Sequence, residues 1–178
     1  MSLLWIPILI LLFSLAYASA SGAPWVPTFK RDIERIRRLL DLKDGEKFVE
    51  LGCGDGRVVL ALSSPLLQKE RDRVRSKIIA VGVELSIIQW IAAQIRRIIT
   101  RSWNTRFVLG NAFAYDLRDA DAVYLFLLPE TYEKIRPTLE AELKPGARLV
   151  SFVWPIPDWN PAKVDEMPGA AKLYLYVR

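Results

Sequence analysis

Short apolar runs rich in valine, isoleucine and leucine alternate along the chain with segments that repeat their apolar residues at a helical spacing. The runs that predict strands cover residues 48–51, 77–85, 106–112, 122–129 and 147–154, and a further strand is expected in the final "KLYLYVR". Helical spacing is found between them, in residues 57–62, 86–101 and 130–144, with a disturbance expected at Pro137. Continuous apolar strands separated by helices indicate an α/β fold whose mostly parallel sheet carries helices on both faces.

The first apolar run, "LLWIPILILLFSLAYASA" at residues 3–20, contains no charged residue. A helix of this length spans about 27 Å, close to the thickness of the hydrocarbon core of a bilayer. The "ASA" at residues 18–20 resembles a signal-peptide cleavage site, although no Lys or Arg precedes the run. A retained transmembrane anchor is favoured over a cleaved signal peptide, because basic residues such as Lys30, Arg31 and Arg35 follow the run. By the positive-inside rule, we expect a single-pass membrane protein whose folded domain faces the cytoplasm.

We expect the chain to have three parts. These are an N-terminal transmembrane anchor at residues 1–21, a connector with an amphipathic helix at residues 22–46, and a folded domain at residues 47–178. The connector is rich in proline, and Thr28 is the expected N-cap of the helix in "FKRDIERIRRLLDL". At 178 residues the chain has room for one domain with a sizeable core, but not for two.

Two absences in the composition limit the chemistry that the chain can perform. It has no histidine, which excludes an imidazole base and a histidine-ligated metal. Its one cysteine, Cys53, excludes an internal disulfide and a thiolate zinc cluster, so no metal is expected. The net charge of +5 is compatible with binding to RNA or to an anionic membrane surface and does not decide between them.

The segment "KFVELGCGDGRVV" places three glycines between the first predicted strand of the domain and the helix that follows it. A glycine-rich turn at this point of a parallel sheet is where nucleotide-containing ligands bind. The dinucleotide pattern G-x-G-x-x-G needs a glycine at position 57, where this chain has Arg57. The acids Glu50 and Asp55 suit a cationic ligand better than a phosphate.

The string E-x-G-x-G-x-G, formed by Glu50, Gly52, Gly54 and Gly56, closely resembles the first motif of the seven-stranded, class I S-adenosylmethionine-dependent methyltransferases. In that family the glycine loop and its acid hold the methionine part of the cofactor, and an acid that ends the second strand holds both ribose hydroxyls. Glu84 in "AVGVELS" stands at that second place. The resemblance implies a Rossmann-like domain with S-adenosyl-L-methionine as cofactor. The cofactor-binding residues that it implies are Glu50, Gly52, Cys53, Gly54, Asp55, Gly56, Glu84, Leu85, Asn111 and Ala112.

The uncharged N-terminal span followed by "GAPWVPT", "VELGCGDGRVV" and "GVELS" resembles, more narrowly, the membrane-anchored protein-lysine methyltransferases of the ATP synthase c subunit and the adenine nucleotide translocase. This resemblance implies lysine methylation of an integral membrane protein, with no nucleic acid as partner. The acceptor amine must be neutral when it attacks, which a water-excluding site favours by desolvation. Aromatic walls suit such a channel, because their π faces hold the cationic side chain while they exclude water. The candidate substrate-binding residues are Trp25, Pro27, Thr28, Trp154 and Trp159, and we name no catalytic base.

Other acceptors stay open at this stage. A lipid, a quinone or another small molecule at the membrane would also suit an anchored enzyme, and RNA would suit the basic charge. A non-enzymatic scaffold is disfavoured because Glu50, the three glycines and Glu84 are all present. The candidate aromatic residues also have an alternative role, in packing the proline-rich loops or in lying at a bilayer interface.

Overall fold

The computed structural model describes residues 5, 6, 9, 26–64 and 78–178. Within these residues, seven strands form one sheet in the order β3-β2-β1-β4-β5-β7-β6. The strands are β1 (Lys47–Leu51), β2 (Ile79–Glu84), β3 (Thr105–Leu109), β4 (Ala122–Leu125), β5 (Arg148–Phe152), β6 (Lys163–Asp165) and β7 (Leu173–Val177). Strands β1 to β5 run parallel to one another, whereas β7 is antiparallel to both β5 and β6. The chain reverses its direction across the sheet at β1, and ligands of open α/β sheets bind at the carboxyl ends of the strands that flank such a point.

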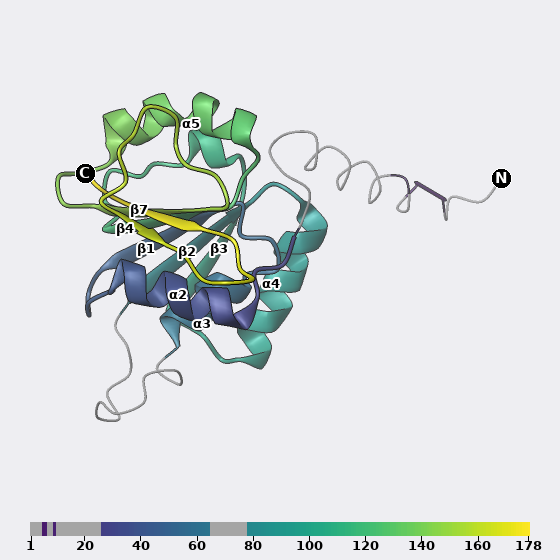
Figure 1. The fold of residues 1–178 in the computed structure, drawn as a ribbon. Coiled ribbons are helices and arrows are strands. Elements are labelled where there is room, and N and C mark those ends of the chain that lie inside the picture. Colours follow the sequence, from purple (N-terminus) through teal and green to yellow (C-terminus); the bar gives the residue numbers. More distant parts are fainter. Residues whose placement is uncertain (1–4, 7–8, 10–25, 65–77) are drawn as a thin grey trace.

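Helices cover both faces of the sheet, as the sequence predicts (Figure 1). One face carries α2 (Lys30–Leu40), α3 (Arg57–Ser63) and α4 (Ile87–Ile99), and the other carries α5 (Pro129–Glu142). Successive strand residues point to opposite faces, so that Phe48 and Tyr124 join the first core while Val49 and Val123 join the second. The predicted α/β fold with a mostly parallel sheet is therefore confirmed.

The connector helix α2 is fastened to the far edge of the sheet by a buried arginine. Arg35 donates to Asp32 Oδ1 at 2.9 Å, to Asp165 Oδ1 at 2.6 Å and to the Ala171 carbonyl at 2.8 Å. A buried guanidinium is tolerated only where its charge and its N–H groups are matched in this way. The arginine thereby joins α2 to β6 and to the segment that leads into β7.

Three local predictions need correction. Thr28 is not the N-cap of α2, because Phe29 takes that position without a side-chain cap and the Thr28 hydroxyl contacts Tyr124 instead. The third strand ends at Leu109, and residues Ala112–Ala114 form a short 3-10 helix, η2. Helix α5 continues through Pro137 to Glu142 without the expected interruption. The short strand β6 was not expected, because its three residues follow a proline-rich stretch without apolar alternation.

The predicted membrane location also needs correction. In the part of the chain that the structure describes, no helix is long and apolar enough to cross a membrane. The longest of these helices, α5, has 14 residues, and a transmembrane helix needs about 20. A single-pass protein with its folded domain facing the cytoplasm is therefore not supported. The predicted anchor at residues 1–21 lies, apart from residues 5, 6 and 9, outside the described residues.

Candidate active site

The glycine loop leaves the carboxyl end of β1 and returns as the first turn of α3. Gly52, Gly54 and Gly56 have φ values of 79°, 53° and 73°, a region that other residues rarely adopt. The backbone N–H groups of Gly52 and Cys53 donate to the Val83 carbonyl at 2.9 and 3.0 Å, which fixes the loop against β2. The conformation of the loop therefore depends on its glycines and on these backbone hydrogen bonds to β2.

The third glycine has a second function, in packing. A Cβ atom added at Gly56 would lie 2.5 Å from Cζ of Phe107 and 3.1 Å from the Cβ of Ala93. Gly82 on β2 is similarly constrained, because a Cβ there would lie 2.6 Å from Cys53 Sγ. Burial raises the pKa of the Cys53 thiol well above its usual value, so that the Cys53 side chain is a neutral group that packs between the loop and β2.

Glu84 ends β2 and joins three segments at the carboxyl edge of the sheet. Its Oε2 accepts from the backbone N–H of Gly54 and its Oε1 from that of Ser86, each at 2.8 Å. Its carbonyl accepts from Gly110 N–H at 2.9 Å, which brings the loop after β3 to the same place. Each carboxylate oxygen still has lone pairs for further donors, as contact with a diol requires.

Glu50 lies in the neighbouring strand and is buried with an incomplete set of partners. Its side chain is 4% exposed, and among the described residues nothing donates a hydrogen bond to its Oε2. Desolvation raises the pKa of Glu50 well above its usual value, the charges of Asp55 and Glu84 raise it further, and the backbone N–H of Val59 opposes the shift. A buried carboxylate oxygen of this kind suits a cationic donor supplied by a ligand.

Asp55 differs from Glu50, because its charge is matched by the protein itself. Its carboxylate pairs with Arg57 at 2.7 Å and with Arg96 of α4 at 3.0 Å. Burial opposes the ionisation of Asp55, but the hydrogen bond from Arg57 and the charges of both arginines outweigh it and hold the pKa below its usual value. Of the two acids that suggested a cationic ligand, Glu50 is therefore the one that carries the argument.

The remaining predicted cofactor residues are Asn111 and Ala112, in the loop after β3, and Leu85, after β2. Asn111 precedes η2 and its Oδ1 accepts from the Phe113 N–H at 3.0 Å, which sets the direction of the short helix. Ala112 is the first residue of η2, and Leu85 directly follows Glu84. The hydrogen bond from Gly110 to Glu84 places these residues beside the end of β2.

The predicted acceptor residues are not all gathered in one place. Thr28 Oγ1 lies 3.4 Å from the hydroxyl of Tyr124, both side chains are buried, and Tyr124 is in register with Glu50. Pro27 precedes Thr28 and is partly buried. Through Tyr124, this contact connects the connector to β4, beside Glu50 of β1.

The two predicted tryptophans that the structure describes, Trp154 and Trp159, have different positions. Trp154 follows β5 at the carboxyl edge, and its carbonyl accepts from the Ser151 hydroxyl at 2.8 Å. Trp159 instead packs edge-on against Tyr176 at 5.6 Å and donates to Glu140 at 3.0 Å, which are contacts with β7 and α5. Trp25 lies outside the described residues. Their role in acceptor binding stays a prediction.

Sequence reasoning missed Tyr124, Gly82 and the aromatic pair that follows β4 and ends β5. The rings of Phe126 and Phe152 meet edge to face at 4.8 Å. Tyr124 had a detectable signal, because its hydroxyl is the one polar side-chain group in the run "AVYLFLLP". Gly82 had no such signal in the sequence, since a single glycine in a strand does not reveal which side chain lies against it.

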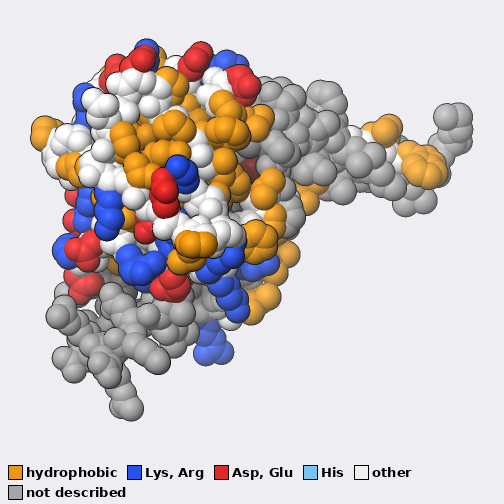
Figure 2. All heavy atoms as spheres, viewed as in Figure 1, with side chains coloured by type: hydrophobic (Ala, Val, Ile, Leu, Met, Phe, Trp, Pro, Cys, Tyr) orange, Lys and Arg blue, Asp and Glu red, His pale blue; other side chains and the backbone are white. Residues whose placement is uncertain are grey.

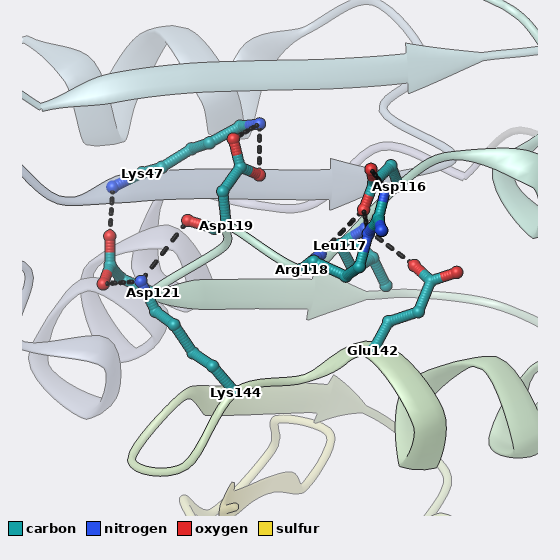
Figure 3. A network of polar contacts seen from close by, with 8 residues as sticks. All are labelled: Lys47, Asp116, Leu117, Arg118, Asp119, Asp121, Glu142 and Lys144. Atoms are coloured by element: carbon teal, nitrogen blue, oxygen red, sulfur yellow. Dashed lines mark hydrogen bonds and ion pairs between the residues drawn. The ribbon is translucent and has the colours of Figure 1, made fainter.

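The amino edge of the sheet carries a different kind of polar cluster (Figure 3). Lys47 Nζ pairs with Asp119 at 2.6 Å, and Lys144 Nζ pairs with Asp121 at 2.6 Å. Asp121 also accepts from the backbone N–H of Lys47 at 2.8 Å. Asp119 and Asp121 thus each have a basic partner, which is typical of a structural network.

Comparisons with known proteins agree with this geometry. The model of the ANTKMT methyltransferase domain matches residues 50–163. A protein-lysine N-methyltransferase of Saccharolobus islandicus (strain REY15A) is 33% identical over 86% of this chain and 92% of its own length. The adenine nucleotide translocase lysine N-methyltransferase of Mus musculus is 33% identical over 79% of this chain, and the lysine N-methyltransferase of the ATP synthase c subunit from Homo sapiens is 26% identical over 79%. The chain spans just over half the length of these two mammalian relatives, 57% and 56%.

A similar solved structure contains a ligand derived from the cofactor. The RNA methyltransferase from Salinibacter ruber, in complex with S-adenosyl-L-homocysteine, is 27% identical with a TM-score of 0.77, over 85% of this chain and 93% of its own. S-adenosyl-L-homocysteine is the demethylated product of S-adenosylmethionine, and the buried, incompletely partnered Glu50 beside Glu84 fits that cationic cofactor. The chain therefore belongs to the ANTKMT methyltransferase family and is an S-adenosylmethionine-dependent methyltransferase.

Proposed function

We propose that this enzyme methylates the side-chain nitrogen of a lysine in a membrane-associated protein. One observation carries the lysine assignment: the relative that shares 92% of its length with this chain is a protein-lysine N-methyltransferase. That the acceptor protein is associated with a membrane is the more specific part of this proposal. It is supported by the names of two relatives, which act on the adenine nucleotide translocase and on the c subunit of ATP synthase.

The cofactor is proposed to bind across the carboxyl ends of β1, β2 and β3. Glu84 would accept from the two ribose hydroxyls, and Glu50 would face the ammonium group with its unpartnered Oε2. The backbone from Gly52 to Gly56, with Cys53 and Asp55 shaping it, would enclose the methionine part, and Leu85, Asn111 and Ala112 would border the adenine. When bound, the cofactor supplies an electrophilic methyl group on a sulfonium.

The protein must then present a neutral amine in a site that excludes water. Burial raises the pKa of Tyr124 well above its usual value, with the hydrogen bond from Thr28 opposing that shift. Its phenol therefore stays protonated at neutral pH and acts as a hydrogen-bonding group, not as a base. We propose that Thr28 and Tyr124 close the acceptor side of the site, with Trp154 at its rim. Desolvation lowers the pKa of the lysine, so that it releases its proton to solvent before its nitrogen attacks the methyl group.

Radioactive methyl transfer into a membrane fraction tests this function. The full chain is incubated with the fraction and with S-adenosylmethionine labelled on its methyl group, and protein, lipid and RNA are extracted separately. We expect label in protein, as methyl-lysine, and no transfer by Glu84→Ala, while the exposed control Glu133→Ala behaves as wild type. Label in the lipid extract alone would overturn the proposal.

RNA is the second candidate acceptor, because the Salinibacter ruber relative is called an RNA methyltransferase and this chain has a net charge of +5. The same experiment separates the two. If RNA is the acceptor, label appears in the RNA extract and transfer falls steeply as salt is raised, since phosphate contacts are weakened by salt.

A further inference from the structure

Helix α4 presents an uninterrupted isoleucine face to the outside of the molecule. At about 100° per residue, positions 87, 88, 91, 95, 98 and 99 fall within an arc of roughly 120°. All six positions are isoleucine. The side that packs on the sheet is instead lined by Ala93 and Trp90, whose indole donates to the Phe107 carbonyl at 3.1 Å. The usual arrangement, with apolar residues inward, is therefore reversed on this helix.

The isoleucines of this face are solvent-exposed to an unusual degree. The exposed fractions are 52% for Ile95 and 74% for Ile99, and Ile87, Ile91 and Ile98 are exposed as well. Trp103, just beyond the helix, is also exposed. Figure 2 shows hydrophobic side chains along the edge of the molecule where α4 lies, with basic side chains beside them. A contiguous apolar face of this kind marks an interaction surface.

The charged residues within and directly after α4 are all basic, and one of them, Arg96, also pairs with Asp55 of the glycine loop. Residues 85–115, which contain α4 and β3, include four arginines and no Asp, Glu or Lys. Arg96 and Arg97 lie in the last turn of α4, and Arg101 and Arg106 follow it. The guanidinium of Arg97 lies 5.8 Å from the centroid of the Trp103 ring. Isoleucines bordered by arginines and an exposed tryptophan form the pattern of a helix that lies on an anionic lipid surface.

We propose that α4 binds an anionic lipid surface with its isoleucine face, lying in the plane of one leaflet. This contact requires no part of the chain to cross the membrane. A second copy of the chain is a poorer occupant, because residues 85–115 contain no acid, so that pairing two such faces would bring two sets of arginines together. An anionic headgroup layer matches both the apolar face and the surrounding charge.

Co-sedimentation of the full chain with vesicles tests the proposal. The vesicles contain 30% phosphatidylserine in phosphatidylcholine, and pure phosphatidylcholine vesicles serve as the neutral comparison. Ile95→Glu is the test variant, and Ile79→Glu is a matched control, because Ile79 is 53% exposed and belongs to β2 instead of α4. Ile99→Glu is a second test variant at the most exposed position of the face. Melting curves establish that each variant is folded.

We expect wild-type protein and Ile79→Glu to bind the anionic vesicles alike. Ile95→Glu and Ile99→Glu should each bind at least about tenfold more weakly, because a charged side chain is driven out of the acyl region. Binding to neutral vesicles should be weaker, and 0.5 M salt should reduce binding to the anionic ones. Equal binding by the α4 variants, or equal binding to neutral vesicles, would overturn the proposal. A dimer that Ile95→Glu dissociates, without vesicle binding by the wild type, would overturn it in favour of a second copy.

Discussion

The two edges of the sheet differ in whether their charged side chains have partners. At the amino edge, Lys47, Asp119, Asp121 and Lys144 form ion pairs at the surface in which each charge has its counterpart (Figure 3). At the carboxyl edge, Glu50 is buried with a raised pKa and an oxygen that no described residue satisfies. Burial of Glu50 therefore costs stability at the carboxyl edge, and a hydrogen-bond donor from a bound ligand would offset that cost, whereas these four charges of the amino edge are already paired. Such a difference favours the carboxyl edge as the functional one by an argument that is independent of any motif.

The largest effect on stability is expected at the glycine that packs α3 against the sheet. Gly56→Ala would place a methyl group 2.5 Å from the buried ring of Phe107, at a φ of 73°. We expect a loss of about 3 kcal/mol in the free energy of unfolding, measured by urea denaturation. The matched control is Gly146→Ala, where φ is 81° and nothing lies within 4 Å of the added Cβ. It should lose only about 1 kcal/mol, and equal losses would refute the packing role of Gly56.

Glu50→Gln should stabilise the free protein while weakening cofactor binding. Because the folded-state pKa of Glu50 is raised, its contribution to stability is present below the ordinary carboxyl pKa and is lost as pH rises through the folded-state value. The variant lacks this titration, so it should exceed wild type by about 1–3 kcal/mol at pH 8 and by less at pH 5.

Urea denaturation of both proteins across this pH range measures the difference, and titration with S-adenosylmethionine should show roughly tenfold weaker binding by the variant. A stability difference that does not change with pH would contradict the assignment of a raised pKa to Glu50.

Tyr124→Phe tests the acceptor side of the carboxyl edge. It removes the hydroxyl that meets Thr28 at 3.4 Å and leaves the ring in place. We expect a loss of about 1 kcal/mol in stability and a methyl-transfer rate about tenfold lower, with the affinity for S-adenosylmethionine unchanged. An equal loss in cofactor affinity would place Tyr124 on the cofactor side instead.

The smallest effect belongs to the amino edge. Asp119→Asn removes the partner of Lys47 in an exposed ion pair, which is typically worth less than about 0.5 kcal/mol. Unfolding and cofactor titration should both be nearly those of wild type. A loss comparable to that of a carboxyl-edge variant would erase the contrast between the two edges.

The sheet and its functional carboxyl edge could largely be predicted from the sequence. The alternation of apolar strands and helices predicts the sheet, and the Glu50–Gly56 string with Glu84 predicts the carboxyl edge, because these features depend on short local patterns. The outward isoleucines of α4 were not predictable, since periodicity shows that a helix has an apolar face but not that the smaller Ala93 packs against the sheet instead. The pairing of Asp55 with Arg96 was not predictable either, because these residues are 41 positions apart in the chain and meet only once the sheet has formed.

The central claim is that Glu84 and the glycine loop hold S-adenosylmethionine, and calorimetric titration of the full chain tests it most directly. Wild type and the control Glu133→Ala should bind one equivalent with equal affinity. Glu84→Ala should bind at least about 100-fold more weakly, because it loses charge-assisted hydrogen bonds to the ribose and the anchor of the Gly54 N–H. Binding by folded Glu84→Ala within about threefold of wild type, on a scale where tenfold is about 1.4 kcal/mol, would contradict the account.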